Sequence, residues 1–157
     1  MSERVERLLA RLQKGIDKTM TIFGSIRQAQ WGVVLYEEPY PWTVRDLLAH
    51  FVSAEEGLLR LAQDIAAGGP GAADDFDYDE YNAAEQERLA GIPPEQLLAD
   101  LIAARQRTIA WVAGLREADL DRVGRHPALG EVTLEAFVNA IYGHQLMHMR
   151  DLMQAFG

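Results

Sequence analysis

The chain has 157 residues, no cysteine and a formal net charge of −9. Its length is that of one ordinary domain, so we expect residues 1–157 to form a single domain. Without cysteine the chain has no disulfide, no thiolate metal site and no thiol nucleophile of its own. The negative charge disfavours nucleic acid and anionic membranes as partners, because both attract basic surfaces. The charged N-terminal residues and the absence of a long apolar run predict a soluble, cytoplasmic protein.

Apolar residues at helical spacing predict a first helix from residue 2 to about residue 30. Pro39 and Pro41 prevent this helix from continuing. Thr43 then has the features of an N-cap, because Thr43 and Asp46 have the spacing of a capping box, with Asp in place of Glu. The second helix that begins there should end at the glycines and proline of residues 68–71.

The second half of the chain predicts two more long helices. An acidic stretch at residues 74–91 is long for a loop and can hold one short helix. Pro93 and Pro94 open a third long helix, whose apolar positions continue to Leu115. After a polar connection, residues 133–156 form a fourth helix that is apolar on almost every side. No strand-type alternation persists, so the chain predicts an all-α four-helix bundle.

Two of the four histidines, His144 and His148, lie four residues apart in the last predicted helix. This spacing places both imidazoles on one helical face, one turn apart, where they can bind one metal ion. The same spacing suits two polar side chains on a core helix, so the pair alone leaves both interpretations open. A third histidine, His50, lies on the apolar face of the second helix, where a lone histidine is usually a core residue.

His50 can meet the other two histidines only if the second and last helices run antiparallel. It lies about 10 Å from the start of its helix, and His148 lies a similar distance from the end of the last helix. Antiparallel helices bring these residues to the same height, whereas parallel helices would separate His50 from the pair by roughly 9 Å. An antiparallel arrangement is an up-down-down-up bundle with a long crossover between the second and third helices, and residues 68–92 supply that crossover.

Other metal motifs fit the chain poorly. A zincin needs a glutamate directly after the first histidine of the pair, and Gln145 stands there. A di-iron bundle needs Glu-x-x-His on two helices, and no histidine here has a glutamate three residues before it. Asp75, Asp77 and Asp79 have the first spacings of a calcium loop but lack its glycine, so we interpret the acidic run as a solvated loop. We interpret His126, in the polar connection, as a surface residue.

Histidines that bind a metal usually donate their second ring N–H to a neighbouring group. Asp46 lies one turn before His50, and Asp151 lies three residues after His148, so either carboxylate could accept this hydrogen bond. For Asp46 we favour the simpler role of capping its helix, and Asp151 can equally be an exposed residue near a helix end. Three polar residues of the crossover can roof a pocket above the histidines: Tyr78, Tyr81 and Asn82.

The segments PWTVRDLLAHF (residues 41–51) and YGHQLMHMRDL (residues 142–152) resemble the second and last helices of the DinB-like family. The resemblance extends over essentially the whole chain, and the three histidines in order are its specific part. It implies an up-down-down-up four-helix bundle whose metal ligands are His50, His144 and His148. The metals of this family are zinc, nickel or similar divalent ions.

The resemblance also bears on activity. Several DinB-like proteins are S-transferases that join a low-molecular-weight thiol to an electrophile, or mycothiol-dependent isomerases, and many have no assigned activity. The resemblance therefore implies a divalent-metal-binding protein and a metal-dependent enzyme that transfers a thiol cosubstrate to a small molecule. A metal-dependent hydrolase and a non-catalytic metal-binding or scaffold bundle remain as alternatives. We expect no nucleic-acid partner and no membrane partner, and a homodimer as one form of assembly.

Overall fold

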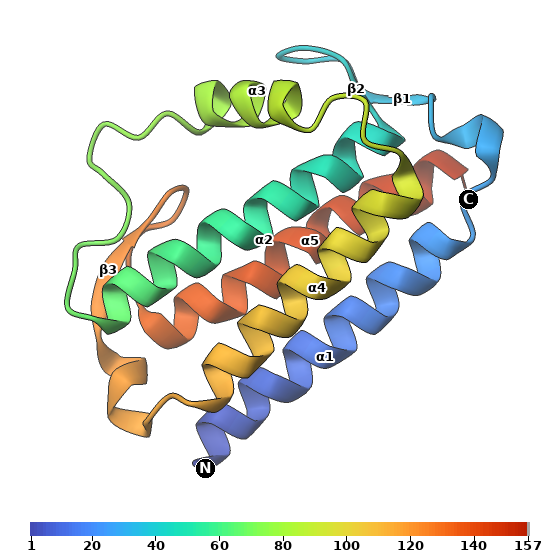
Figure 1. Ribbon diagram of the computed structural model, residues 1–157. Helices are drawn as coiled ribbons and strands as arrows, with labels where there is room; N and C mark the ends of the chain where they lie inside the picture. Colours follow the sequence, from blue (N-terminus) through green and yellow to red (C-terminus); the bar gives the residue numbers. More distant parts are fainter. Residues whose placement is uncertain (157) are drawn as a thin grey trace.

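Four long helices form the body of the molecule in the computed structural model, which describes residues 1–156 (Figure 1). They are α1 (Glu3–Gly24), α2 (Val44–Ala66), α4 (Pro94–Ala113) and α5 (Leu134–Phe156). Helices α1 and α5 run in one direction and α2 and α4 in the other (Figure 1). Both α1 and α2 pack against α4 and α5. The predicted up-down-down-up four-helix bundle is confirmed, and with it the antiparallel arrangement of α2 and α5.

The predicted start of α2 is confirmed atom by atom. The Thr43 hydroxyl accepts the Asp46 backbone N–H at 3.1 Å, and the Asp46 carboxylate accepts the Thr43 backbone N–H at 3.0 Å. This reciprocal pair satisfies two backbone donors that a helix start leaves without partners. Helix α4 likewise begins at Pro94, as predicted, because a proline in the first turn of a helix has no N–H to leave unpaired.

The first helix ends earlier than the sequence pattern predicts. It stops at Gly24 instead of about residue 30, and the Ser25 backbone N–H caps the carbonyls of Ile22 and Phe23. A short 3-10 helix, η1 (Gln28–Gln30), follows. The apolar pattern continues beyond the helix because Ile26 still packs against the core cluster without being helical. The apolar pattern therefore predicted correctly that Ile26 packs against the core, but not that the helix ends before it.

Two short hairpins are present where the sequence predicted no strand. Strand β1 (Val34–Tyr36) pairs with β2 (Trp42–Thr43), and β3 (Val123–His126) pairs with β4 (Gly130–Thr133), both antiparallel. Strands of two to four residues are too short for an alternating pattern to be visible in the sequence. A second 3-10 helix, η2 (Glu117–Asp121), connects α4 to the second hairpin. Each hairpin leads directly into one of the two helices that carry the histidines.

The crossover between α2 and α4 contains the short helix that the acidic stretch allowed, α3 (Tyr78–Arg88), which lies across α2 (Figure 1). The N-terminal part of the crossover is tied to β3. The Ala72 N–H donates to the Arg125 carbonyl at 2.9 Å, and the Arg125 N–H donates to the Pro70 carbonyl at 2.8 Å. None of the residues of α3 is buried, so this helix covers the bundle without joining its core.

A polar layer divides the interior into two apolar clusters, one around Phe51 and Leu101 and the other around Val112 and Phe137. At the centre of this layer lies a completely buried ion pair between Glu55 of α2 and Arg105 of α4. Two hydrogen bonds join Glu55 to Arg105, and three more link the pair to its neighbours, so that the network connects all four long helices.

These bonds leave no charge of the pair unmatched. The Glu55 carboxylate accepts from Arg105 Nε at 2.9 Å and Nη2 at 2.8 Å, and also from the Thr108 hydroxyl and the Gln145 amide. Arg105 Nη1 donates to the Leu12 carbonyl of α1 at 2.8 Å. A buried charge of this kind is tolerated only when it is paired and hydrogen-bonded. The sequence analysis did not predict this network, which holds α2 and α5 together close to the histidines.

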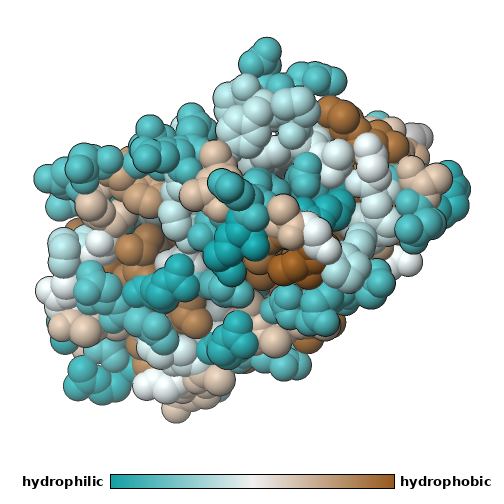
Figure 2. Space-filling model, turned by 45° about the horizontal axis from the view of Figure 1, so that its top comes forward, coloured by the Kyte–Doolittle hydropathy of each residue, from teal (hydrophilic) through white to brown (hydrophobic). Residues whose placement is uncertain are grey.

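Hydrophilic residues cover most of the face shown in Figure 2, with smaller apolar areas between them. Within residues 1–156, no helix combines the length and the apolar character needed to cross a bilayer.

Candidate metal centre

The structure brings together the three histidines that the sequence singled out. His50 extends from α2 toward His144 and His148 of α5, and one ring nitrogen of each residue lies within 4.8 Å of the others. The Nε2 atoms of His50 and His144 are 3.0 Å apart. This convergence depends on the antiparallel course of α2 and α5. The positions of His50 and His148 along their helix axes required the same arrangement.

Two of the three donors have the spacing of ligands on one divalent ion. Two nitrogen ligands at about 2.0–2.1 Å from one ion lie roughly 3.0–3.4 Å apart at the usual coordination angles, and the observed separation of Nε2 atoms falls in this range. Burial, with the charges of His144 and His148, lowers the pKa of His50 well below its ordinary value. Burial also lowers the pKa of His144 to about 3. Metals bind the neutral imidazole, which is the form that these surroundings stabilise.

A tyrosine that the sequence analysis missed supports His148. The Tyr36 hydroxyl lies 2.8 Å from His148 Nδ1 and donates its own hydrogen to the Asp151 carboxylate. Its oxygen therefore accepts the hydrogen of His148 Nδ1, which leaves Nε2 of that ring with a free lone pair. Burial, and then the hydrogen bond to Asp151, raise the pKa of Tyr36, so the phenol keeps the proton that it donates. Asp151 thus lies in the predicted neighbourhood but reaches the imidazole through Tyr36.

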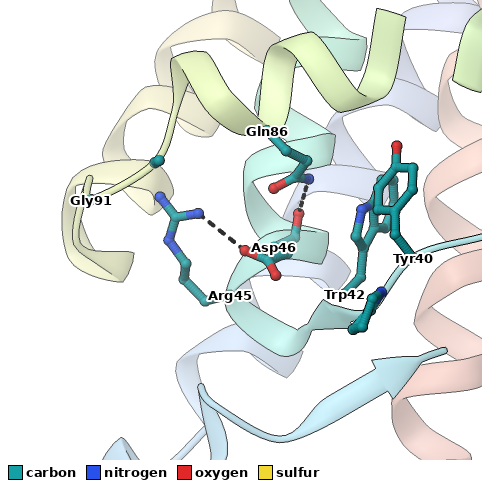
Figure 3. Close-up of a pocket in the computed structure, with 8 residues that line it drawn as sticks. Tyr40, Trp42, Arg45, Asp46, Gln86 and Gly91 are labelled. Atoms are coloured by element: carbon teal, nitrogen blue, oxygen red, sulfur yellow. Dashed lines mark hydrogen bonds and ion pairs between the residues drawn. The ribbon is translucent and has the colours of Figure 1, made fainter. Parts of the chain in front are cut away.

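Asp46, the other predicted supporting residue, lies in the cap of α2 and not beside an imidazole. Besides the Thr43 N–H, its carboxylate accepts a hydrogen bond from Arg45 at 3.2 Å, and its backbone carbonyl accepts one from Gln86 at 2.8 Å (Figure 3). These groups line a separate pocket of about 370 Å³. Asp46 therefore has the capping role that the sequence analysis favoured. His50 Nδ1 is buried and has no hydrogen-bond partner within the described residues, so Asp46 does not fill its alternative role as the acceptor for that ring.

A larger pocket, of about 570 Å³, opens beside the three histidines. Its roof includes Tyr78, Tyr81 and Asn82 of α3, as the sequence analysis expected. Its other walls include residues of α2, α5 and the turn after β3, together with Trp42 of β2 and Phe76 before α3. The imidazoles therefore face a space that can admit a small molecule.

The fourth histidine also lines this pocket, which corrects its interpretation as a surface residue. His126 is half-buried, with its ring centroid 4.8 Å from that of Phe137. The β3–β4 hairpin places it there, and the sequence gave no visible sign of so short a hairpin. Its Nδ1 accepts hydrogen bonds from the backbone N–H groups of Ala128 and Leu129, so this nitrogen is not available as a metal ligand.

The comparisons with known proteins agree with this architecture. Residues 3–152 match the sequence model of the DinB superfamily. The chain belongs to the DinB superfamily. No curated protein matches the chain.

Several solved structures share the fold of this DinB-superfamily chain at low sequence identity. YfiT from Bacillus subtilis, described as a probable metal-dependent hydrolase with an unusual four-helix bundle topology, is 18% identical with a TM-score of 0.76. The match covers 98% of this chain and 87% of YfiT. A mycothiol-dependent maleylpyruvate isomerase is 18% identical with a TM-score of 0.78, over 97% of this chain and 63% of the isomerase.

A third structure, the colibactin self-resistance protein ClbS in complex with double-stranded DNA, is 16% identical with a TM-score of 0.71. That match covers 96% of this chain and 95% of ClbS. At these identities the likeness establishes a common fold, and the activities belong to the proteins for which they are described.

Proposed function

We propose that His50, His144 and His148 hold one divalent ion, zinc or nickel, and that the protein transfers a low-molecular-weight thiol to a small electrophile. The observation that carries this proposal is the convergence of three neutral imidazoles at the wall of a cavity of about 570 Å³. Three protein ligands leave coordination positions open, as in catalytic rather than structural sites. When bound, such an ion acts as a Lewis acid that lowers the pKa of a thiol or of water.

The lining of the pocket favours a thiol over water as the nucleophile. A thiol is acidic enough to ionise at such a centre without a base, whereas water benefits from a neighbouring carboxylate. Within the described residues, the side chains that line the pocket include no Asp or Glu. The chain has no cysteine, so the thiol must be a cosubstrate. The mycothiol-dependent isomerase with the same fold supports this choice.

The residues of the chain then have distinct tasks. His148 keeps its Nε2 lone pair free because Tyr36 and Asp151 hold the hydrogen on Nδ1. The apolar walls exclude water from the electrophile, which limits the competing hydrolysis. In the transfer itself, the thiol sulfur forms a bond to the electrophilic carbon, the thiol proton passes to solvent, and the leaving group departs with the bonding electrons.

Metal binding is tested first. Protein treated with a chelator is titrated with zinc and with nickel, as wild type, His148→Ala and His126→Ala. The His126→Ala variant is the matched control, because it removes an imidazole from the same pocket but not from the cluster. We expect one ion per chain, a large loss of affinity in His148→Ala, and little change in the control. Equal affinity in all three proteins would rule out this site.

Activity is tested next with an aryl chloride as a generic electrophile. The metal-loaded protein is supplied with a small thiol or with water alone, and release of chloride is followed. We expect thiol-dependent turnover that the His148→Ala substitution abolishes. Release of chloride at the same rate without thiol would favour the metal-dependent hydrolase. A bound metal without turnover under any condition would favour the non-catalytic bundle.

A further inference from the structure

The pocket beside the histidines is long, and its two ends differ in chemistry. It follows α2 from His50 to Leu61, and the imidazoles lie at one end. Between the ends the walls are mainly apolar, with Leu58, Phe76, Met147 and Pro127 among the lining residues. At the other end lies Arg60, an exposed residue that forms no ion pair within residues 1–156.

Several polar side chains of the pocket carry hydrogen-bond donors. The Tyr81 hydroxyl is buried and has no partner at hydrogen-bonding distance and angle in the described part of the chain. Burial, and then the Glu85 carboxylate, raise the pKa of Tyr81, so the phenol keeps its proton. The Asn82 amide also faces this pocket. The second ring nitrogen of His126 carries a hydrogen, because Nδ1 already accepts two backbone N–H groups.

Gly57 brings two of these donors to one place. A methyl group at Gly57 would lie 2.9 Å from the Tyr81 hydroxyl and 3.8 Å from Arg60 Nη2. Both atoms therefore lie against the same point on α2, and the Tyr81 hydroxyl occupies the space that a side chain at Gly57 would take. A guanidinium and a phenol that converge in this way match a planar anion, which can accept a hydrogen bond from each.

Unmatched donors in a pocket without acidic residues call for a ligand that supplies acceptors and negative charge. Only one arginine and no lysine line the pocket among the described residues, so the pocket can neutralise one negative charge on a ligand. A phosphate monoester carries close to two charges at neutral pH and would be only half neutralised. We infer that Arg60 and Tyr81 bind the carboxylate of a small apolar molecule whose opposite end reaches the three histidines.

The position of Gly57 sets the length of this molecule. Gly57 lies seven residues after His50, which corresponds to about 10 Å along the helix axis. The ligand should therefore carry its carboxylate roughly 10 Å from the level of His50, with an apolar body between. This inference rests on the proposed function, because it takes the end of the ligand near the histidines as the electrophilic end. The electrophile would then belong to the class of apolar carboxylic acids.

The test compares two probes that share one shape and differ in charge, phenylbutyrate and phenylbutyramide. Their affinities are measured by calorimetry on chelator-treated protein, so that no bound ion attracts the carboxylate, and again after zinc is added. In wild type we expect the carboxylate to bind about tenfold more tightly than the amide, the usual scale of one charge-assisted hydrogen bond. Arg60→Gln should remove this preference.

Two further variants make the result specific. Arg107→Gln, which removes an exposed arginine from α4 outside the pocket, should leave the preference unchanged. Gly57→Ala should weaken the binding of phenylbutyrate, because the added methyl group displaces the Tyr81 hydroxyl. Equal affinities of the two probes in wild type, a preference that survives Arg60→Gln, or binding of neither probe would each overturn the inference.

The outcome can be separated from that of the proposed function. If zinc and nickel fail to bind but the preference for the carboxylate disappears in Arg60→Gln, the anion site stands and the metal centre falls. If His148→Ala abolishes metal binding but both probes bind equally, the metal centre stands and the anion site falls.

Discussion

Replacing Tyr36 by Phe should weaken metal binding although Tyr36 is not itself a predicted ligand. The substitution removes only the hydroxyl. The ring can keep its packing against Trp42 and against His148, with ring centroids 6.5 Å and 5.7 Å away. The lost oxygen lies 2.8 Å from His148 Nδ1 and donates to Asp151, so one change removes both contacts.

The expected magnitude follows from the tautomer of His148. Without the Tyr36 oxygen, the hydrogen on Nδ1 loses its acceptor, and the ring can instead carry its hydrogen on Nε2, where it blocks metal binding. Removal of such a supporting group typically reduces metal affinity by about 10- to 100-fold, equivalent to about 1.4–2.7 kcal/mol. Asp151→Asn should produce an effect of the same sign, because it weakens the acceptor for the Tyr36 hydroxyl.

Zinc affinity is measured by competition with a chromophoric chelator, and the tautomer of His148 by long-range proton–nitrogen NMR correlations in metal-free protein. Wild type should show the hydrogen on Nδ1, and Tyr36→Phe a mixture. Tyr40→Phe is the matched control, because Tyr40 also packs against Trp42 but its hydroxyl donates to the Asp79 carbonyl, at 3.3 Å. The reasoning is refuted if the two variants have the same zinc affinity, or if the tautomer does not change.

Three further predictions concern stability and dynamics. Arg105→Met should destabilise the protein by about 3–5 kcal/mol in urea unfolding, because Glu55 stays buried without its partner. The double variant with Glu55→Leu should recover most of this loss of stability. A loss below about 1 kcal/mol in Arg105→Met would contradict the role of the network. Metal-free protein should lose stability on acidification, because the pKa of His144 is lowered to about 3 in the folded state. The unfolded chain then takes up protons that the folded chain excludes, so the free energy of unfolding should fall by about 1.4 kcal/mol for each such imidazole between about pH 7.5 and about pH 5.5. A flat profile of stability over this range would show that the imidazoles titrate normally. Residues 68–92 should exchange their amide hydrogens faster than α5, since no residue of α3 is buried, and equal protection of the two segments would count against this.

Local patterns in the sequence were sufficient to predict the four long helices, apart from the end of the first, and to single out the three histidines that the structure brings together. The capping box of Thr43 and Asp46 and the proline at position 94 act within one turn of a helix, so their effect is visible in a few consecutive residues. The spacing of His144 and His148 is equally local. The antiparallel direction of α2 and α5 was consistent with the long crossover and was required for these two histidines to meet His50, and the structure confirms it.

The tertiary structure alone decided which groups support the site. Tyr36 is 112 residues from His148, and Glu55 is 50 residues from Arg105. Neither pair has a spacing that a periodic pattern could reveal. His126 entered the pocket through a hairpin too short to be recognised from alternation. A helix forms through contacts between near neighbours, so it produces a periodic pattern of apolar residues in the sequence. A hydrogen bond between distant residues depends on how the helices and strands pack, and it produces no periodic pattern.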